Sequence, residues 1–174
     1  YYAGWSDKYQ QVFGTVNPVA SSHFNFSLPE QTGIVSILAP EEYPLLGLVS
    51  LTAPAIVGGN TCIVLASQQY PLTAISFAEV LHSSDVPGGV VNILTGLREE
   101  LIEHLSSHMD INAFLYTDTD PDKAVRKQID ENAALSVKRV IHRPVENWLD
   151  KQYEDPYFIM DMQEIKTTWH PVGL

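Results

Sequence analysis

A short uncharged loop holds the residues that are best placed to bind a ligand. It reads Ala66, Ser67, Gln68 and Gln69, and it follows the apolar run 62–65. Such a run is typical of a strand covered on both faces, and in an open α/β sheet ligands bind at the carboxyl ends of the strands. Hydroxyl and amide groups can hydrogen-bond a ligand, but they bring no charge to it. What stands in this loop therefore decides the function.

The chain has a single cysteine, Cys62. One cysteine excludes an internal disulfide and a cysteine-based zinc cluster. Because Cys62 lies inside the apolar run, burial should raise the pKa of its thiol and make it a small core residue instead of a nucleophile. We therefore expect a reducing, cytoplasmic location.

Two histidines have the spacing of a zinc-binding pair. His104 and His108 are separated by one helical turn, with Glu103 and Asp110 nearby. A zinc site needs further ligands in a recognisable pattern, and none follows. Exposed histidines that complement the helix dipole are the favoured interpretation, so we predict no metal site.

Acidic side chains are the remaining candidates. Glu41 and Glu42 could form an acid pair at a cleft, although a solvated loop is favoured for loop carboxylates. Asp118, Asp120 and Asp122 alternate as in a calcium loop. They lack the glycine and the terminal glutamate of such a loop, which favours a helix N-cap region.

Alternating strands and helices must position these residues. The stretch 54–73 is central, because Gly58 and Gly59 are expected to supply a turn with positive φ before the strand, and Pro71 fits the first turn of the next helix. Apolar runs predict strands over 33–39, 62–65, 90–94, 111–117 and 137–142, with helices over 45–57, 73–82, 99–106 and 121–134. Repeated strand–helix units imply parallel strands with right-handed crossovers.

We expect three parts. Residues 33–143 form a doubly wound, mostly parallel Rossmann-like sheet of the α/β class. Residues 1–32 contain a helix over 1–13 and edge strands over 15–28. Residues 144–174 form a tail with a strand over 163–169. The terminal strands do not fit the alternation and should pair with each other or with another subunit.

Charge and composition limit the partners. The net charge of -11 argues against nucleic acid and against an anionic membrane surface. No apolar run reaches the length of a membrane span. The chain opens without a methionine and without a basic and apolar leader. We expect no secretory signal, and we expect the segment to come from the middle of a longer protein.

Several motifs in one order resemble the coenzyme-binding part of the aldehyde dehydrogenase superfamily. They are Y-Y-A-G-W at 1–5, P-A at 54–55 with G-N-T at 59–61, P-L-T-A at 71–74, P-G-G-V-V-N-I at 87–93 and I-K-T at 165–167. The resemblance implies a Rossmann-like NAD(P)-binding fold, oligomerisation strands and NAD(P)-dependent aldehyde oxidation in the parent family. It extends without gaps from about residue 33 to residue 140.

The same resemblance implies that functional positions have been replaced. Glu42 stands where the family has the asparagine that binds the substrate oxyanion, and a carboxylate cannot donate to an oxyanion. Arg143 stands at the position of the catalytic glutamate, and Asp118 at that of a glycine in the turn that admits the nucleotide. The family's cofactor contacts fall on Leu38, Ala39, Pro40, Leu65, Gln68, Gly96 and Thr119. Leu65 and Gln68 replace the lysine and glutamate that meet the ribose.

The family's catalytic domain, with its nucleophilic cysteine, is absent from this sequence. It should follow the catalytic glutamate, but only residues 144–163 separate Arg143 from Glu164. Together the losses resemble the degenerate carboxy-terminal unit of aldehyde dehydrogenase family 16. We therefore expect no catalytic residues and no cofactor in this chain itself.

Three functions remain in view. The first, which we favour, is a non-catalytic module that oligomerises or binds a protein partner through its terminal strands. The second is a residual nucleotide site without chemistry, suggested by Gly96 at a cofactor-contact position. The third is a contribution to a longer NAD(P)-dependent aldehyde dehydrogenase whose complete catalytic unit lies elsewhere.

Overall fold

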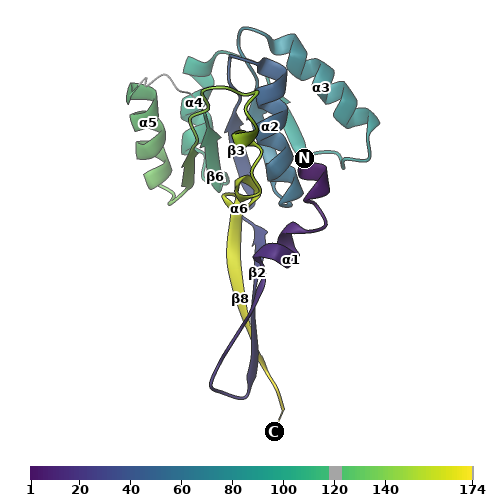
Figure 1. The fold of residues 1–174 in the computed structure, drawn as a ribbon. Helices are drawn as coiled ribbons and strands as arrows, with labels where there is room; N and C mark the ends of the chain where they lie inside the picture. Colours follow the sequence, from purple (N-terminus) through teal and green to yellow (C-terminus); the bar gives the residue numbers. More distant parts are fainter. Residues whose placement is uncertain (118–122, 174) are drawn as a thin grey trace.

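The computed structural model describes residues 1–117 and 123–173 of the chain. An α/β body carries a long antiparallel arm that projects from one end (Figure 1). The body contains a five-stranded parallel sheet in the order β5-β4-β3-β6-β7. Its strands are β3 (Ile34–Leu38), β4 (Thr61–Leu65), β5 (Val91–Leu94), β6 (Ala113–Tyr116) and β7 (Arg139–His142). The predicted Rossmann-like α/β class is confirmed.

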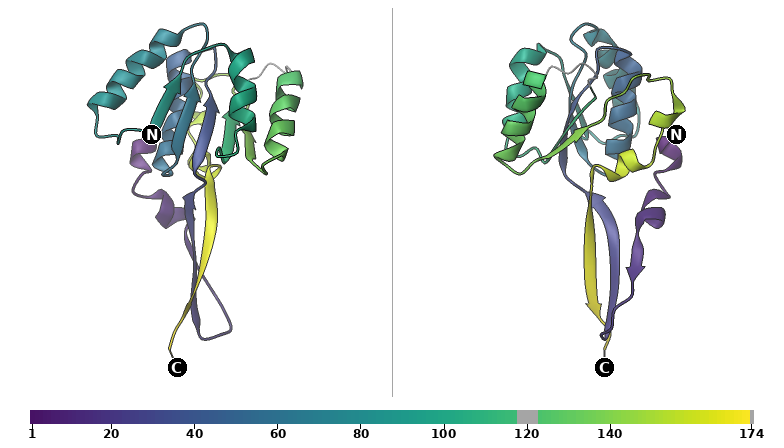
Figure 2. Two further views of the ribbon diagram at one scale, coloured as in Figure 1. Left: turned by 180° about the vertical axis from the view of Figure 1, so that it is seen from behind. Right: turned by 60° about the vertical axis from the view of Figure 1, so that its left-hand side comes forward.

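Helices cover both faces of this sheet (Figure 2). One face packs against α2 (Pro44–Val57) and α3 (Pro71–Ser83). The other packs against α4 (Arg98–Ser107) and α5 (Lys123–Ala134). Side chains alternate between the two cores, as strand geometry requires: Val35 and Ile37 belong to the first, and Leu38 belongs to the second.

The turn before β4 differs in one detail from the prediction. Gly59 has a positive φ of 84°, but Gly58 has the right-handed φ of -72°. Gly58 is required for space instead, because a Cβ there would come within 2.2 Å of the Gln163 side chain. Pro71 opens α3 as expected.

The prediction of a single helix over residues 1–13 is wrong. A 3₁₀ turn (Tyr2–Gly4) and the short helix α1 (Tyr9–Phe13) take its place, joined by a turn. Tyr2 and Tyr9 are buried with Ile159 of the tail. Packing of these aromatic rings against a distant segment, together with turn-favouring residues between them, outweighs the helical periodicity.

The arm is a three-stranded antiparallel sheet in the order β1-β2-β8. Its strands are β1 (Thr15–Asn17), β2 (His23–Gln31) and β8 (Gln163–Pro171). The pairing of β2 with β8 runs from His23 opposite Pro171 to Gln31 opposite Gln163. The two ends of the chain thus pair with each other, as one of the two expected arrangements required.

The tail between β7 and β8 packs back onto the body. It contains a 3₁₀ turn (Lys151–Tyr153) and the short helix α6 (Tyr157–Met160), which the sequence did not indicate. Trp148 is buried beside the α2 side of the sheet. Within the described ranges, no helix has the length and apolarity needed to cross a bilayer.

Candidate functional site

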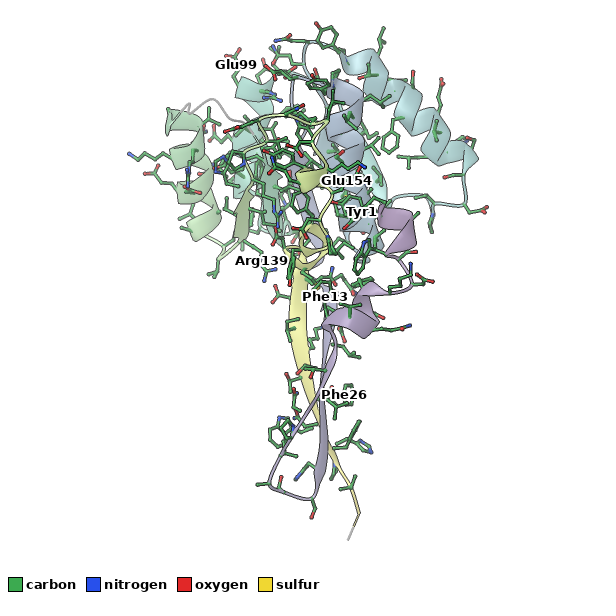
Figure 3. All side chains as sticks on the ribbon, in the orientation of Figure 1. Tyr1, Phe13, Phe26, Glu99, Arg139 and Glu154 are labelled. Atoms are coloured by element: carbon green, nitrogen blue, oxygen red, sulfur yellow. The ribbon has the colours of Figure 1, made fainter. Side chains whose placement is uncertain are left out.

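The loops that follow β3, β4 and β5 meet at the carboxyl edge of the sheet. The backbone ladder continues into them, since Ala39 N donates to Leu65 O at 2.9 Å and Ala66 N donates to Leu94 O at 2.9 Å. Figure 3 labels Glu99, in the first turn of α4, at the end of the body opposite the arm. This edge is where an open α/β sheet binds its ligand.

A carboxylate of the chain itself occupies this edge. Ser67 Oγ donates to Glu41 Oε2 at 2.6 Å, and the backbone N–H groups of Gln68 and Gln69 donate to the same carboxylate at 3.0 and 3.1 Å. The guanidinium of Arg98 forms an ion pair with it, with 2.7 Å between Nε and Oε1. We call Glu41, Ser67, Gln68, Gln69 and Arg98 the edge cluster.

Arg98 also ties the three loops together. Its Nη2 donates to the backbone carbonyl of Ala39, and its own N–H donates to Gln68 Oε1 at 3.0 Å. The amide side chain of Gln68 therefore satisfies a donor at the start of α4, a position where helices leave N–H groups unpaired. The side-chain oxygen of Gln68 and the guanidinium of Arg98 are thus both engaged within the chain.

These contacts change the acidity of Glu41. Burial by itself raises the pKa of this carboxyl. The hydrogen bonds from Ser67, Gln69 and Gln68, together with the charge of Arg98, outweigh burial and hold the pKa below its ordinary value. Glu41 is therefore an ionised internal anion at neutral pH.

The expectation that Glu41 belongs to a solvated loop is wrong, because its contacts come from loops that no local pattern links to it. Glu42 is exposed, as expected for a solvated loop. The sequence patterns did not indicate Arg98 as a site residue. One signal could have found it, since Arg98 is the only lysine or arginine between Lys8 and Lys123.

The expected cofactor positions are placed as follows. Leu38, Ala39, Pro40 and Leu65 are buried, and Pro40 packs so closely on Gly47 that a Cβ there would lie 2.2 Å from Pro40 Cγ. Gly96 is exposed in the loop after β5. Thr119, and with it Asp118, Asp120 and Asp122, lies outside the described residues.

Arg143 lies after β7 and is held by the tail. Its N–H donates to Tyr116 O at 3.0 Å, and its guanidinium pairs with the carboxylate of Asp161. Its Cζ lies 3.6 Å from the centre of the Phe158 ring. A shallow depression of about 350 Å³ adjoins it, lined by His142, Arg143, Pro144, Gln152, Tyr153, Asp155 and Phe158.

Neither Cys62 nor the histidine pair forms a reactive centre in the described part of the chain. Cys62 is fully buried, and burial raises the pKa of its thiol to about 12. His108 uses Nδ1 to accept from the backbone N–H of Asp110 at 3.3 Å. Among the residues that the structure describes, no group of three or more histidine, cysteine, aspartate or glutamate side chains could hold a metal ion.

Comparisons with known proteins identify a family. The model of the aldehyde dehydrogenase family matches residues 1–143. Cytosolic 10-formyltetrahydrofolate dehydrogenase of Xenopus laevis is 37% identical over 142 residues, which are 80% of this chain and 15% of that protein. Omega-crystallin of Enteroctopus dofleini is 38% identical over 117 residues, which are 67% of this chain and 23% of that protein.

Solved structures agree. The NAD⁺ complex of aldehyde dehydrogenase from Bacillus cereus superposes with a TM-score of 0.74 at 27% identity, over 82% of this chain and 28% of that one. PnpE from Pseudomonas sp. WBC-3, in complex with nicotinamide adenine dinucleotide, gives a TM-score of 0.75 at 26% identity, over 83% of this chain and 28% of that one. The present chain thus spans less than a third of each of these proteins.

The edge offers a nicotinamide dinucleotide a different set of groups from the lysine and glutamate that the resemblance implies for the family. Glu41 places a negative charge at this edge, and that charge disfavours an anionic pyrophosphate beside it because like charges repel. Ser67 Oγ and the backbone N–H groups of Gln68 and Gln69 already donate to Glu41, and the side-chain oxygen of Gln68 accepts from the start of α4.

Proposed function

Since this chain belongs to the aldehyde dehydrogenase family, we propose that it is a non-catalytic, dehydrogenase-like module that assembles with another protein chain through its arm. The observation that carries this proposal is the exposed state of β8. In the described part of the chain β8 pairs along one edge only, with β2, over its nine residues. Unpaired strand edges are templates for pairing with another chain.

The faces of the arm support the same proposal. The part of the arm farthest from the body carries no helix in either view of Figure 2, and only α1 lies beside the upper part of β2. The large apolar side chains of the arm remain open to solvent, with 64% exposure for Val16, 56% for Ile165 and 58% for Trp169. Exposed apolar surface on a projecting element is typical of a protein interaction site. We propose a second copy of this chain, or a related dehydrogenase unit, as the partner.

The residues at two positions considered for catalysis, Arg143 and Cys62, support a non-catalytic role for this chain. A general base must accept a proton, and the guanidinium of Arg143 cannot. It is also engaged by Asp161 and Phe158. The thiol of Cys62 is buried within β4 and cannot meet a substrate there.

Sedimentation velocity tests the assembly. The wild-type chain should sediment as more than one copy, and the double variant Ile165→Glu with Trp169→Glu should sediment as a single chain, because charges do not tolerate burial in an interface. Leu135→Glu is the matched control. It also removes an exposed leucine, 83% accessible, but from the position directly after α5 on the body.

The control should keep the wild-type sedimentation. A wild-type chain that is monomeric at every concentration would exclude self-assembly, and capture of a related dehydrogenase unit would then be the remaining form of the proposal. Failure of both forms would overturn it. Separately, turnover of aldehydes with NAD or NADP by the purified chain, lost on a substitution within this chain, would contradict the non-catalytic role.

A second possible function is suggested by how small a part of its relatives this chain covers. Because the chain covers only 15 to 28% of the relatives and structures compared, we propose that it can be part of a longer NAD(P)-dependent aldehyde dehydrogenase whose complete catalytic unit lies elsewhere. Deleting this segment from such a polypeptide should then reduce both its oligomeric mass and its aldehyde turnover. Retention of both would contradict this function. The narrower resemblance to family 16 stays a prediction.

A further inference from the structure

The edge cluster has the chemistry of an oxyanion site. Two consecutive backbone N–H groups, from Gln68 and Gln69, converge on one carboxylate together with a hydroxyl and a guanidinium. Backbone amides that converge in a loop, together with arginine, are the donors by which proteins hold carboxylates and phosphates. In this chain the anion is Glu41.

The side chains of Glu41, Ser67 and Arg98 in the edge cluster are largely buried and are held by several contacts, so the cluster is not a chance contact at the surface. The side chains of Arg98 and Glu41 are only 19% and 22% exposed. Ser67 is 2% exposed, and its Oγ accepts from the N–H of Tyr70 at 3.1 Å while it donates to Glu41. Arg98 is fixed by the carbonyl of Ala39 as well as by the carboxylate. Ser67 and Arg98 are therefore each held by a contact besides the one to Glu41.

We infer that the edge cluster is an oxyanion cradle whose resident ligand is Glu41 of the same chain, and that this internal ligand closes the carboxyl edge of the sheet to nucleotides. A carboxylate tethered to the chain has a high effective concentration at the cradle, which an external anion must overcome. An incoming phosphate would also meet the negative charge of Glu41. The closed cradle rests on the proposed function and extends it, because Glu41 would keep a nucleotide from the edge at which the family binds its coenzyme.

Removal of the internal ligand should make the cradle available. In Glu41→Ala the hydroxyl, both amides and Arg98 remain, and each lacks its anion. Small oxyanions should then bind in trans. We name acetate, which reproduces the lost carboxylate, inorganic phosphate, and AMP, which adds a nucleoside to a phosphate.

Thermal unfolding in acetate, phosphate or AMP, against sodium chloride at equal ionic strength, tests this. The melting temperature of Glu41→Ala should rise saturably with acetate and phosphate, by about 5 °C or more when the anion exceeds its Kd a hundredfold. The wild-type chain should show no saturable rise with these anions, with AMP or with NAD. Glu42→Ala is the matched control, because it removes the same charge from the neighbouring exposed position and leaves the cradle filled.

Each result decides the inference. A saturable rise in Glu41→Ala alone supports it, and an added response to AMP shows that the opened edge also admits a nucleoside. Equal responses in all three proteins, or none in Glu41→Ala, would overturn it. Should Glu41→Ala be unfolded in chloride, the measurement becomes recovery of its circular dichroism: recovery in acetate supports the cradle, and failure in every anion overturns it.

The outcome is separable from that of the proposed function. A wild-type chain that binds AMP or NAD while it assembles through the arm would overturn the closed cradle alone. A chain that fails to assemble but shows anion binding only in Glu41→Ala would overturn the assembly alone.

Discussion

The guanidinium of Arg143 lies over the ring of Phe158, with 3.6 Å from Cζ to the ring centroid. The same group pairs with Asp161, so the end of β7 is fastened to both ends of α6. In the family resemblance this position belongs to the catalytic glutamate, which has to be free to accept a proton. Here a cation at that position holds the tail against the body.

Arg143→Ala should destabilise the fold through the loss of this fastening. A cation–π contact contributes about 0.5 to 2 kcal/mol, and a partly exposed ion pair contributes up to about 1 kcal/mol. We expect the free energy of unfolding in urea to fall by about 1 to 2 kcal/mol for the alanine variant. The free energy of unfolding of Arg143→Lys should lie between those of the wild type and Arg143→Ala, because lysine keeps the charge but not the planar group.

Arg126→Ala is the matched control for Arg143. Arg126 pairs with Asp130 at 3.8 Å on the exposed face of α5, with side-chain exposures of 59% and 51%. Exposed helical pairs are weak, so the control should stay within about 0.5 kcal/mol of wild type. Equal losses in both variants would show that the tail contact has no special weight.

The edge cluster predicts a pH dependence. The folded pKa of Glu41 is lowered from the ordinary value of 4.5, so its ionised contacts stabilise the fold fully above pH 4.5 and are lost as the pH falls through the lower, folded pKa. The free energy of unfolding of Glu41→Gln at pH 7 should be about 1 to 2 kcal/mol lower than that of the wild type. This difference should shrink in urea titrations below pH 4.5.

Glu42→Gln provides the comparison for that titration. Glu42 is exposed, and substitutions at such positions change stability by less than about 0.5 kcal/mol. If the Glu41→Gln difference stayed constant down to pH 3, the carboxylate would not be the source of the stabilisation.

Sequence patterns predicted the sheet because its causes are local. The apolar run at β4 and the proline that opens α3 each encode their element within a few residues. All five strands of the body were expected, although β6 and β7 are shorter than predicted. β7 begins only at Arg139 because Val137 adopts a left-handed φ of 53°.

The site could not be predicted in the same way, because its contacts are distant in sequence. The bond from Arg98 to Ala39 joins residues 59 positions apart, and the bond from Gln163 to Gly58 joins residues 105 positions apart. Periodicity carries no information over such separations. The resemblance indicated which functional residues were replaced, but it could not indicate that Glu41 and Arg98 engage each other.

Cys62 should resist modification in the folded chain. Burial raises the pKa of its thiol to about 12, and only the thiolate reacts readily. Ellman's reagent should label no thiol in native protein at pH 8 and the single cysteine of the chain after denaturation. Rapid labelling of the native protein would show that β4 opens, or that the thiol is accessible.

Asn60 should be the most sensitive polar residue at the root of the arm. It is 1% exposed, its Nδ2 donates to Ala55 O at 3.1 Å and to Met162 O at 3.0 Å, and its Oδ1 accepts from Gly33 N at 3.0 Å. Asn60→Ala removes three hydrogen bonds and takes the acceptor from Gly33 N. Ala55 O keeps the backbone N–H of residue 60, and Met162 O keeps Gln163 Nε2. We therefore expect a loss of about 1 to 3 kcal/mol in urea unfolding. Asn147→Ala is the control, since Asn147 is exposed and its side chain accepts only from Leu149 two residues away.

Hydrogen exchange locates the effect of Asn60. Met162 directly precedes β8, so the loss of its bond to Asn60 should speed amide exchange at the start of β8 more than in β3 or β6. Uniform acceleration across the whole sheet would mean that Asn60 stabilises the body in general. Acceleration confined to the root of the arm would show that this side chain joins the arm to the body.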